Sequence, residues 1–134
     1  VQHSEYNASK KDGLHFLQMW ILPAQHGKQP RYEQKDFAGQ REGRLALVVS
    51  PDGRDGSLTI AQDARLYAGR LEGAQRAELE LASGRVAWVH VALGRVQVNG
   101  QLLGAGDGAA VRDEQKLEFA KGERAEFVLW DLPS

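Results

Sequence analysis

Short strand-like runs, separated by turn residues, are the feature that most constrains the fold of this chain. Between residues 44 and 132, apolar and polar residues alternate over short stretches, and clusters such as PDGRDG (51–56), Ser83-Gly84 and Asn99-Gly100 interrupt them. Alternation with a period of two places every second side chain on the same face of an extended strand. Many short strands joined by frequent turns are typical of a β-sandwich or a β-barrel. The sequence therefore predicts an all-β domain.

The clearest strand is expected over residues 85–98, where RVAWVHVALGRVQV is rich in β-branched residues. The Asn99-Gly100 pair after it is a favoured two-residue hairpin turn. Residues 116–132 are expected to form a final hairpin that turns at Lys121-Gly122. Further strands are expected over residues 44–50, 57–71 (one or two strands), 77–82 and 101–111.

The first part of the chain follows a different pattern. LHFLQMWIL (14–22) is apolar on both faces, which predicts a strand that is buried on both sides. The polar stretch 24–36 carries Gly27 and Pro30, and it is expected to be an extended connector. Residues 1–22 together read as a hairpin-like pair of strands. Two strands do not make a domain, so this segment needs a partner sheet.

Composition excludes several classes of protein and site. The formal net charge is −1, from 17 basic and 18 acidic residues, so nucleic acid and an anionic membrane are not expected partners. The chain has no cysteine, which excludes disulfides, thiolate metal sites and cysteine nucleophiles. No apolar run approaches the roughly 20 residues of a membrane helix. A cytoplasmic location is the default expectation.

The segment VQHSEYN (1–7) contains the candidate site residues His3 and Glu5. One residue separates them, so they point to the same face of an extended chain. An imidazole and a carboxylate on one face can hold a first-row metal such as iron, copper, nickel or manganese. They can equally be two solvated polar residues, because His-x-Glu is a short and common pattern.

Three stretches taken in order, VQHSEYN (1–7), LHFLQMWILP (14–23) and PRYEQKDF (30–37), resemble the pirin family of bicupins, especially its quercetin 2,3-dioxygenase-like members. The resemblance implies two cupin barrels in tandem, each an antiparallel jelly roll. Residues 1–36 would be the closing strands and connector of a truncated N-terminal cupin. Residues 37–134 would be a C-terminal cupin barrel. The expected fold class is therefore all-β, with a cupin-type antiparallel jelly-roll barrel.

The resemblance also implies where a metal would bind. The first barrel of such proteins holds the metal through an early His-x-His pair and a later His-x-Glu pair. His3 and Glu5 match the later pair, and the earlier pair is expected upstream of them. The second barrel is expected to be metal-free, because residues 37–134 contain one histidine, His90, which is expected to be a packed core or pocket residue.

By resemblance, the intact parent would bind one divalent metal (iron, copper, nickel or manganese) and open a flavonol with dioxygen. His3 would be a neutral nitrogen ligand, and Glu5 a carboxylate ligand and possible base. With half of the ligands, this chain alone is expected to hold no metal and to be inactive. Its expected partners are the missing N-terminal cupin, a flavonol-like aromatic substrate in the parent, and further copies of itself through exposed strands.

Two other functions stay open. The first is a non-enzymatic, pirin-like regulatory or interaction protein with a structural metal. The second is an unrelated β-sandwich that binds carbohydrate, which would require exposed aromatic side chains on loops. The three tryptophans, Trp20, Trp88 and Trp130, lie within apolar stretches instead and are expected in the core.

Overall fold

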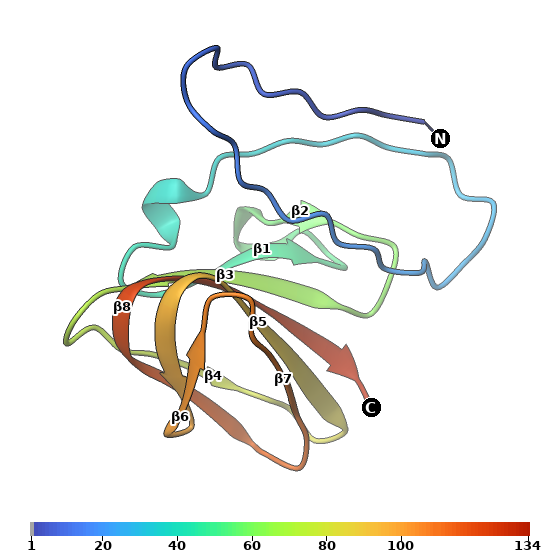
Figure 1. Ribbon diagram of the computed structural model, residues 1–134. Coiled ribbons are helices and arrows are strands. Elements are labelled where there is room, and N and C mark those ends of the chain that lie inside the picture. The colour runs from blue at the N-terminus through green and yellow to red at the C-terminus, as the bar shows by residue number, and fades with distance from the viewer. Residues whose placement is uncertain (1) are drawn as a thin grey trace.

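The computed structural model describes residues 2–134 and shows one curved sheet of eight strands (Figure 1). Val1, the first residue of the expected segment 1–7, lies outside the described residues. The elements, in chain order, are η1 (Ala38–Gln40), β1 (Leu45–Ser50), η2 (Arg54–Gly56), β2 (Leu58–Thr59), β3 (Arg65–Leu71), β4 (Ala77–Glu80), β5 (Arg85–Val98), β6 (Gln101–Gly104), β7 (Gly108–Val111) and β8 (Lys116–Pro133). The predicted all-β class is confirmed.

The sheet has the strand order β2-β1-β3-β8-β5-β6, with β4 also paired to β8 and β7 also paired to β5. Every pair is antiparallel except β1 with β2. Among the described strands, no hydrogen-bonded pair joins β4 to β6 or β7. The sheet therefore curls in the manner of a cupin but stays open along that seam, so the expected barrel is not closed by hydrogen bonds.

The main core fills the concave side of this sheet. Alternate residues of β5 and β8 point into it, and the rings of Phe119 and Phe127 stack there with centroids 4.6 Å apart. The buried members of the core are Leu71, Ala77, Leu81, Ala87, Val89, Val91, Val96, Val98, Leu103, Leu117, Phe119, Ala125, Phe127 and Leu129. Apolar side chains thus fill the space inside the curved sheet, and this burial is the main source of its stability.

The predicted hairpin over residues 116–132 is wrong, because β8 is a single strand throughout. It pairs with β5 along most of its length, while its other edge changes partner from β4 to β3. Lys121 and Arg124 have positive φ angles of 51° and 46° at the point of change, and Gly94 of β5 has a φ of 66°. Left-handed residues in a strand produce bulges and bends. The Lys121-Gly122 pair therefore bends one strand instead of joining two.

The predicted turn at Asn99-Gly100 is confirmed. Both residues have positive φ angles, 47° and 82°, as a type I′ turn requires. The Asn99 side chain donates a hydrogen bond to the Lys116 carbonyl (3.0 Å) and accepts one from the Glu118 backbone N–H (2.7 Å). The β5–β6 turn is therefore fastened to β8.

Residues 2–37 contain no helix or strand. The buried strand expected over residues 14–22 is wrong: Trp20 is 87% exposed and Leu22 is 81% exposed. No strand pairs with this segment, so most of its side chains stay exposed, and only Leu17 and Ile21 are half-buried. The division of the chain at residue 36 or 37 stays a prediction. Among the described residues, no helix is long and apolar enough to cross a membrane.

A second, smaller apolar cluster lies on the opposite, outer face of the sheet. It contains Ala46, Val48 and Leu66, with Phe37 and Trp130 packed against it. Trp88 also points outward and is 45% exposed, because its neighbours in β5 alternate with it and face the main core. The expectation of a core position is thus wrong for both Trp20 and Trp88. Both faces of the sheet are partly apolar.

Candidate metal half-site

His3 and Glu5 line one hollow in the N-terminal segment. The same hollow, of about 350 Å³, is lined by Leu14, Phe16, Leu17 and Gln18. Both candidate residues are exposed. The chain around residues 2–6 therefore lies near the chain around residues 14–18, although no ladder of hydrogen bonds joins the two. We call these two stretches the first arm (2–6) and the second arm (14–20).

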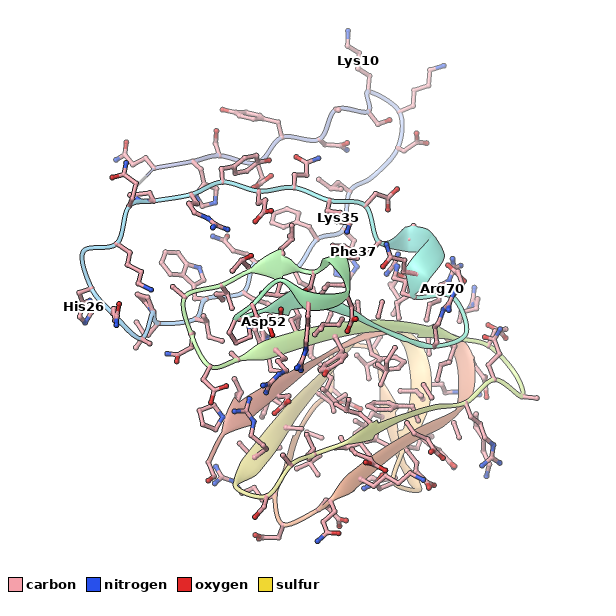
Figure 2. All side chains as sticks on the ribbon, turned by 180° about the vertical axis from the view of Figure 1, so that it is seen from behind. Lys10, His26, Lys35, Phe37, Asp52 and Arg70 are labelled. Carbon is pink, nitrogen blue, oxygen red and sulfur yellow. The ribbon has the colours of Figure 1, made fainter. Side chains whose placement is uncertain are left out.

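A polar turn brings the two arms together. The Asn7 side-chain amide donates to the Asp12 carbonyl (2.7 Å), and the Ser9 hydroxyl donates to the Asp12 carboxylate (2.9 Å). The same hydroxyl accepts hydrogen bonds from the Lys11 and Asp12 backbone N–H groups (3.2 and 3.0 Å). Asn, Ser and Asp favour turns because their side chains bond to nearby backbone groups. Lys10 points away from the molecule at the tip of this turn (Figure 2).

The donor set at this hollow fits a metal only in part. An imidazole nitrogen and a carboxylate oxygen suit first-row divalent metals. A catalytic metal, however, needs about three protein ligands. Within residues 2–134, no group of three or more His, Asp or Glu side chains is placed to hold a metal. His3 and Glu5 therefore amount to half of a donor set, and their role as ligands stays a prediction.

The other histidines do not line this hollow. His15 lines a separate hollow of about 310 Å³ beneath the second arm, beside the ion pair of Arg41 with Glu126 (3.1 Å). His26 lies in an exposed loop (Figure 2). His90 is half-buried on the outer face of β5, next to inward-facing valines. It is thus not part of the main core, so the core half of that expectation is wrong, while a pocket position stays a prediction.

A network of charged side chains that the sequence analysis did not single out lies at one end of β3, β5 and β8. Arg85 donates to the buried carboxylate of Asp131 (2.6 Å) and to Asp63 (2.7 Å), and Arg65 also donates to Asp131 (3.3 Å). Burial opposes the Arg85 cation, but the hydrogen bond and the charge of Asp131 outweigh it and raise the pKa of Arg85. Burial, followed by the charge of Asp131, raises the pKa of Tyr67. These groups neutralise one another, so we assign them a structural role.

The C-terminal end of the connector reaches the sheet through Lys35 and Phe37. Arg31 and Glu33, which carry opposite charges, bond to each other (3.1 Å) and not to the sheet. The Lys35 ammonium donates to the Gly56 carbonyl and lies 5.1 Å from the centre of the Phe37 ring. Figure 2 shows both side chains where the connector meets the sheet. Phe37 then packs on the outer apolar cluster, which anchors the C-terminal end of the connector.

Residues 47–132 match the family model described as the quercetinase C-terminal cupin domain. Over 99% of its length, the chain is 40% identical to the quercetin 2,3-dioxygenase of Escherichia coli, and it covers 57% of that protein. It is 33% identical to a pirin-like protein of Caulobacter vibrioides, with 98% of the chain and 57% of that relative covered. The chain thus spans less than two thirds of the length of these curated relatives.

A solved structure shows the same likeness in three dimensions. The crystal structure of the bacterial pirin YhhW from Escherichia coli in complex with nickel(II) matches this chain with a TM-score of 0.78 and 40% identity. The match covers 85% of this chain and 48% of that one. The cupin assignment therefore has support from both sequence and fold.

Proposed function

This chain belongs to the family of quercetinase C-terminal cupin domains, and from that membership we propose that it is the C-terminal part of a pirin-like, metal-dependent flavonol 2,3-dioxygenase. The observation that carries the proposal is the placement of His3 and Glu5 in one hollow. The 40% identity to the Escherichia coli enzyme over nearly the whole chain supports it.

The proposed organisation has two parts. Residues 1–36 would belong with a preceding N-terminal cupin, and residues 37–134 would be the C-terminal cupin. Curated relatives of greater length leave room for such a domain, since this chain covers 57% of them. The preceding cupin would supply the remaining ligands. Its sheet would also cover the second arm, whose apolar side chains are exposed in this chain.

Each residue of the half-site has a proposed role. A bound divalent metal (iron, copper, nickel or manganese) would supply Lewis-acid activation of the flavonol oxygens. His3 would hold it through a neutral imidazole nitrogen, and Glu5 through a carboxylate oxygen. Glu5 is also the proposed base that accepts a proton from the flavonol hydroxyl. Leu14 and Phe16 would form an apolar wall against an aromatic substrate and exclude water from it.

The first experiment is the metal-to-chain ratio of the purified polypeptide, measured by elemental mass spectrometry after loading with nickel(II). We expect a ratio near zero for this chain alone and near one for a polypeptide that also carries the preceding cupin. There, His3→Ala should lower nickel affinity at least about tenfold, whereas His26→Ala, in an exposed loop, should not. A ratio near one for this chain alone would refute the half-site proposal, and His15 or a second subunit would then be the source of ligands.

Flavonol consumption separates the enzyme from its alternative. Depletion of quercetin by the nickel-loaded longer polypeptide, and its loss in Glu5→Gln, would support the dioxygenase. A filled metal site without depletion would favour a pirin-like regulatory protein with a structural metal. A cytoplasmic location is part of the same proposal.

A further inference from the structure

Three hydrogen bonds join residues 2–37 to the sheet, and all three end in the excursion between β1 and β3 (residues 51–64). The Ala24 backbone N–H donates to the Ala61 carbonyl (2.8 Å). The Gln62 side-chain amide donates to the Leu22 carbonyl (2.8 Å). The third bond joins Lys35 to this excursion. In Figure 1 the blue N-terminal chain runs past β2, which belongs to the excursion. We call the first two bonds the clamp.

Pro23 explains why one of the two clamp bonds comes from a side chain, that of Gln62, and not from the backbone. Proline has no backbone N–H, and its ring keeps the preceding residue, Leu22, in an extended conformation. The stretch from Leu22 to Ala24 therefore presents one carbonyl and one N–H to the neighbouring bend at residues 61–63. The backbone of Ala61 satisfies the N–H, and the Gln62 amide satisfies the carbonyl. The clamp grips the C-terminal end of the LHFLQMWILP stretch (14–23).

A second hydrogen bond orients the Gln62 amide. Its oxygen accepts a hydrogen bond from the Asp63 backbone N–H (2.8 Å), so its nitrogen must face Leu22. The side chain is half-buried. One amide thus makes two distinct bonds, which can be removed separately.

A continuous series of contacts leads from the clamp to the half-site. From Leu22 the chain continues back into the second arm, where Leu17 and Met19 share a hollow with Leu93 and Val128 of the sheet. The polar turn at residues 7–12 then holds the first arm against the second. His3 and Glu5 lie in the hollow between the two arms. The clamp is the backbone attachment nearest to the half-site.

We infer that Gln62 is a positioning residue: its donated hydrogen bond to Leu22 fixes the second arm on the C-terminal cupin and thereby sets the place of His3 and Glu5. The part of this inference that concerns metal binding rests on the proposed function. The clamp itself does not, because it is a contact within this chain. A C-terminal cupin without a metal thus contributes to the metal site of its neighbour.

The size of the effect is bounded by linkage. Gln62 acts on the metal through the equilibrium between held and released arms, so its loss can weaken metal affinity by no more than it weakens the clamp. Removal of one neutral hydrogen bond changes such an equilibrium about three- to tenfold. The expected change in metal affinity therefore lies at or below that range.

The test uses two variants, each of which removes one of the two hydrogen bonds of the Gln62 side chain. Gln62→Glu keeps the acceptor for Asp63 and removes the donor to Leu22. Gln62→Lys keeps a donor of similar reach and removes the acceptor. Gln101→Glu, an exposed position in β6, is the matched control. The readout is hydrogen exchange at the Ala24 amide, followed by NMR and expressed as protection relative to the unfolded chain.

We expect Gln62→Glu to speed exchange at Ala24 about three- to tenfold, while Gln62→Lys and Gln101→Glu stay within about twofold of the parent chain. Equal effects of Gln62→Glu and Gln62→Lys, large or small, would overturn the clamp, because the donated bond would then have no separate role. Ala24 is a suitable reporter, since its own hydrogen bond is unchanged in every variant.

The metal arm uses nickel(II) and a polypeptide that carries the preceding cupin. We expect Gln62→Glu to weaken nickel binding measurably, by a factor no larger than the change at Ala24, and Gln62→Lys to restore it. Unchanged nickel affinity in Gln62→Glu, together with faster exchange, would overturn the positioning role. No nickel binding by the unsubstituted polypeptide would refute the proposed function and its metal half, whereas the exchange data would still decide the clamp.

Discussion

At the bend shared by β5 and β8, the backbone of β8 lies very close to Gly94 of β5. Gly94→Ala therefore tests whether this bend needs a residue without a side chain. Gly94 has a φ of +66°, and a Cβ added there would lie 2.2 Å from the Glu123 carbonyl oxygen and 2.3 Å from that of Arg124. Both atoms belong to the backbone of β8, so they can move only if the bend itself moves. The substitution therefore disturbs the pairing of β5 with β8, the two longest strands of the sheet, at their shared bend.

Two costs add at this position. A left-handed conformation costs a residue with a Cβ about 1–2 kcal/mol. Overlap with packed neighbours costs typically about 1–3 kcal/mol. Gly94→Ala should therefore lower the free energy of unfolding by about 3 kcal/mol, a large part of the roughly 5–15 kcal/mol that stabilises most domains.

Two further glycines separate these costs. Gly100 has a φ of +82° and nothing within 4 Å of an added Cβ, so Gly100→Ala should show the conformational cost alone. At Gly122, whose φ is not in the left-handed region, an added Cβ would lie 2.4 Å from the Leu71 carbonyl oxygen. Gly122→Ala should therefore show the overlap cost alone.

Urea unfolding followed by far-UV circular dichroism, with linear extrapolation, measures all three variants. We expect Gly94→Ala to be the least stable, by at least about 1 kcal/mol relative to Gly100→Ala. A Gly94→Ala chain that is unfolded in buffer, while Gly100→Ala folds, agrees with this expectation. Equal stability of these two variants would refute the close approach of β5 and β8.

Three other predictions follow from single interactions. Asp131→Ala should lower the free energy of unfolding by about 2–3 kcal/mol, because it leaves Arg85 buried with one carboxylate fewer. As a control, Arg95→Ala breaks the exposed ion pair with Glu123 and should leave the urea midpoint unchanged. A neighbouring serine hydroxyl, and after it a backbone N–H, lower the pKa of Asp52 from 3.8. The ionised Asp52 carboxylate should therefore stabilise the fold above pH 3.8, and this stabilisation should disappear as the pH falls through the lower pKa of the folded state. Asp52→Asn should remove the corresponding fall from a plot of Tm against pH. Trp20 is exposed, so we expect self-association in sizing with light scattering and less of it in Trp20→Ser; a monomeric parent chain at high concentration would contradict this.

The half-site shows how far local pattern reaches. The spacing of His3 and Glu5 predicts that they share a face, and the structure places both in one hollow, although on an irregular arm and not on a strand. The Gln62 clamp had no comparable signal, because a single glutamine in a polar loop looks like a solvated residue. Its partner, Leu22, is 40 residues away in the chain, and only the folded structure brings the two together.

The sequence by itself determined the all-β class, the strands between residues 45 and 111 and the Asn99-Gly100 turn, because alternation and turn preference are encoded within a few neighbouring residues. Three motifs near the N-terminus were sufficient to indicate the family. The tertiary structure decided what lies opposite each strand. LHFLQMWIL (14–22) has the composition of a buried strand, yet it is exposed, since a strand needs a partner across its edge and over its faces. Likewise, the Lys121-Gly122 pair became a bend in one strand because β5 continues beside it and keeps β8 paired on both sides of the bend.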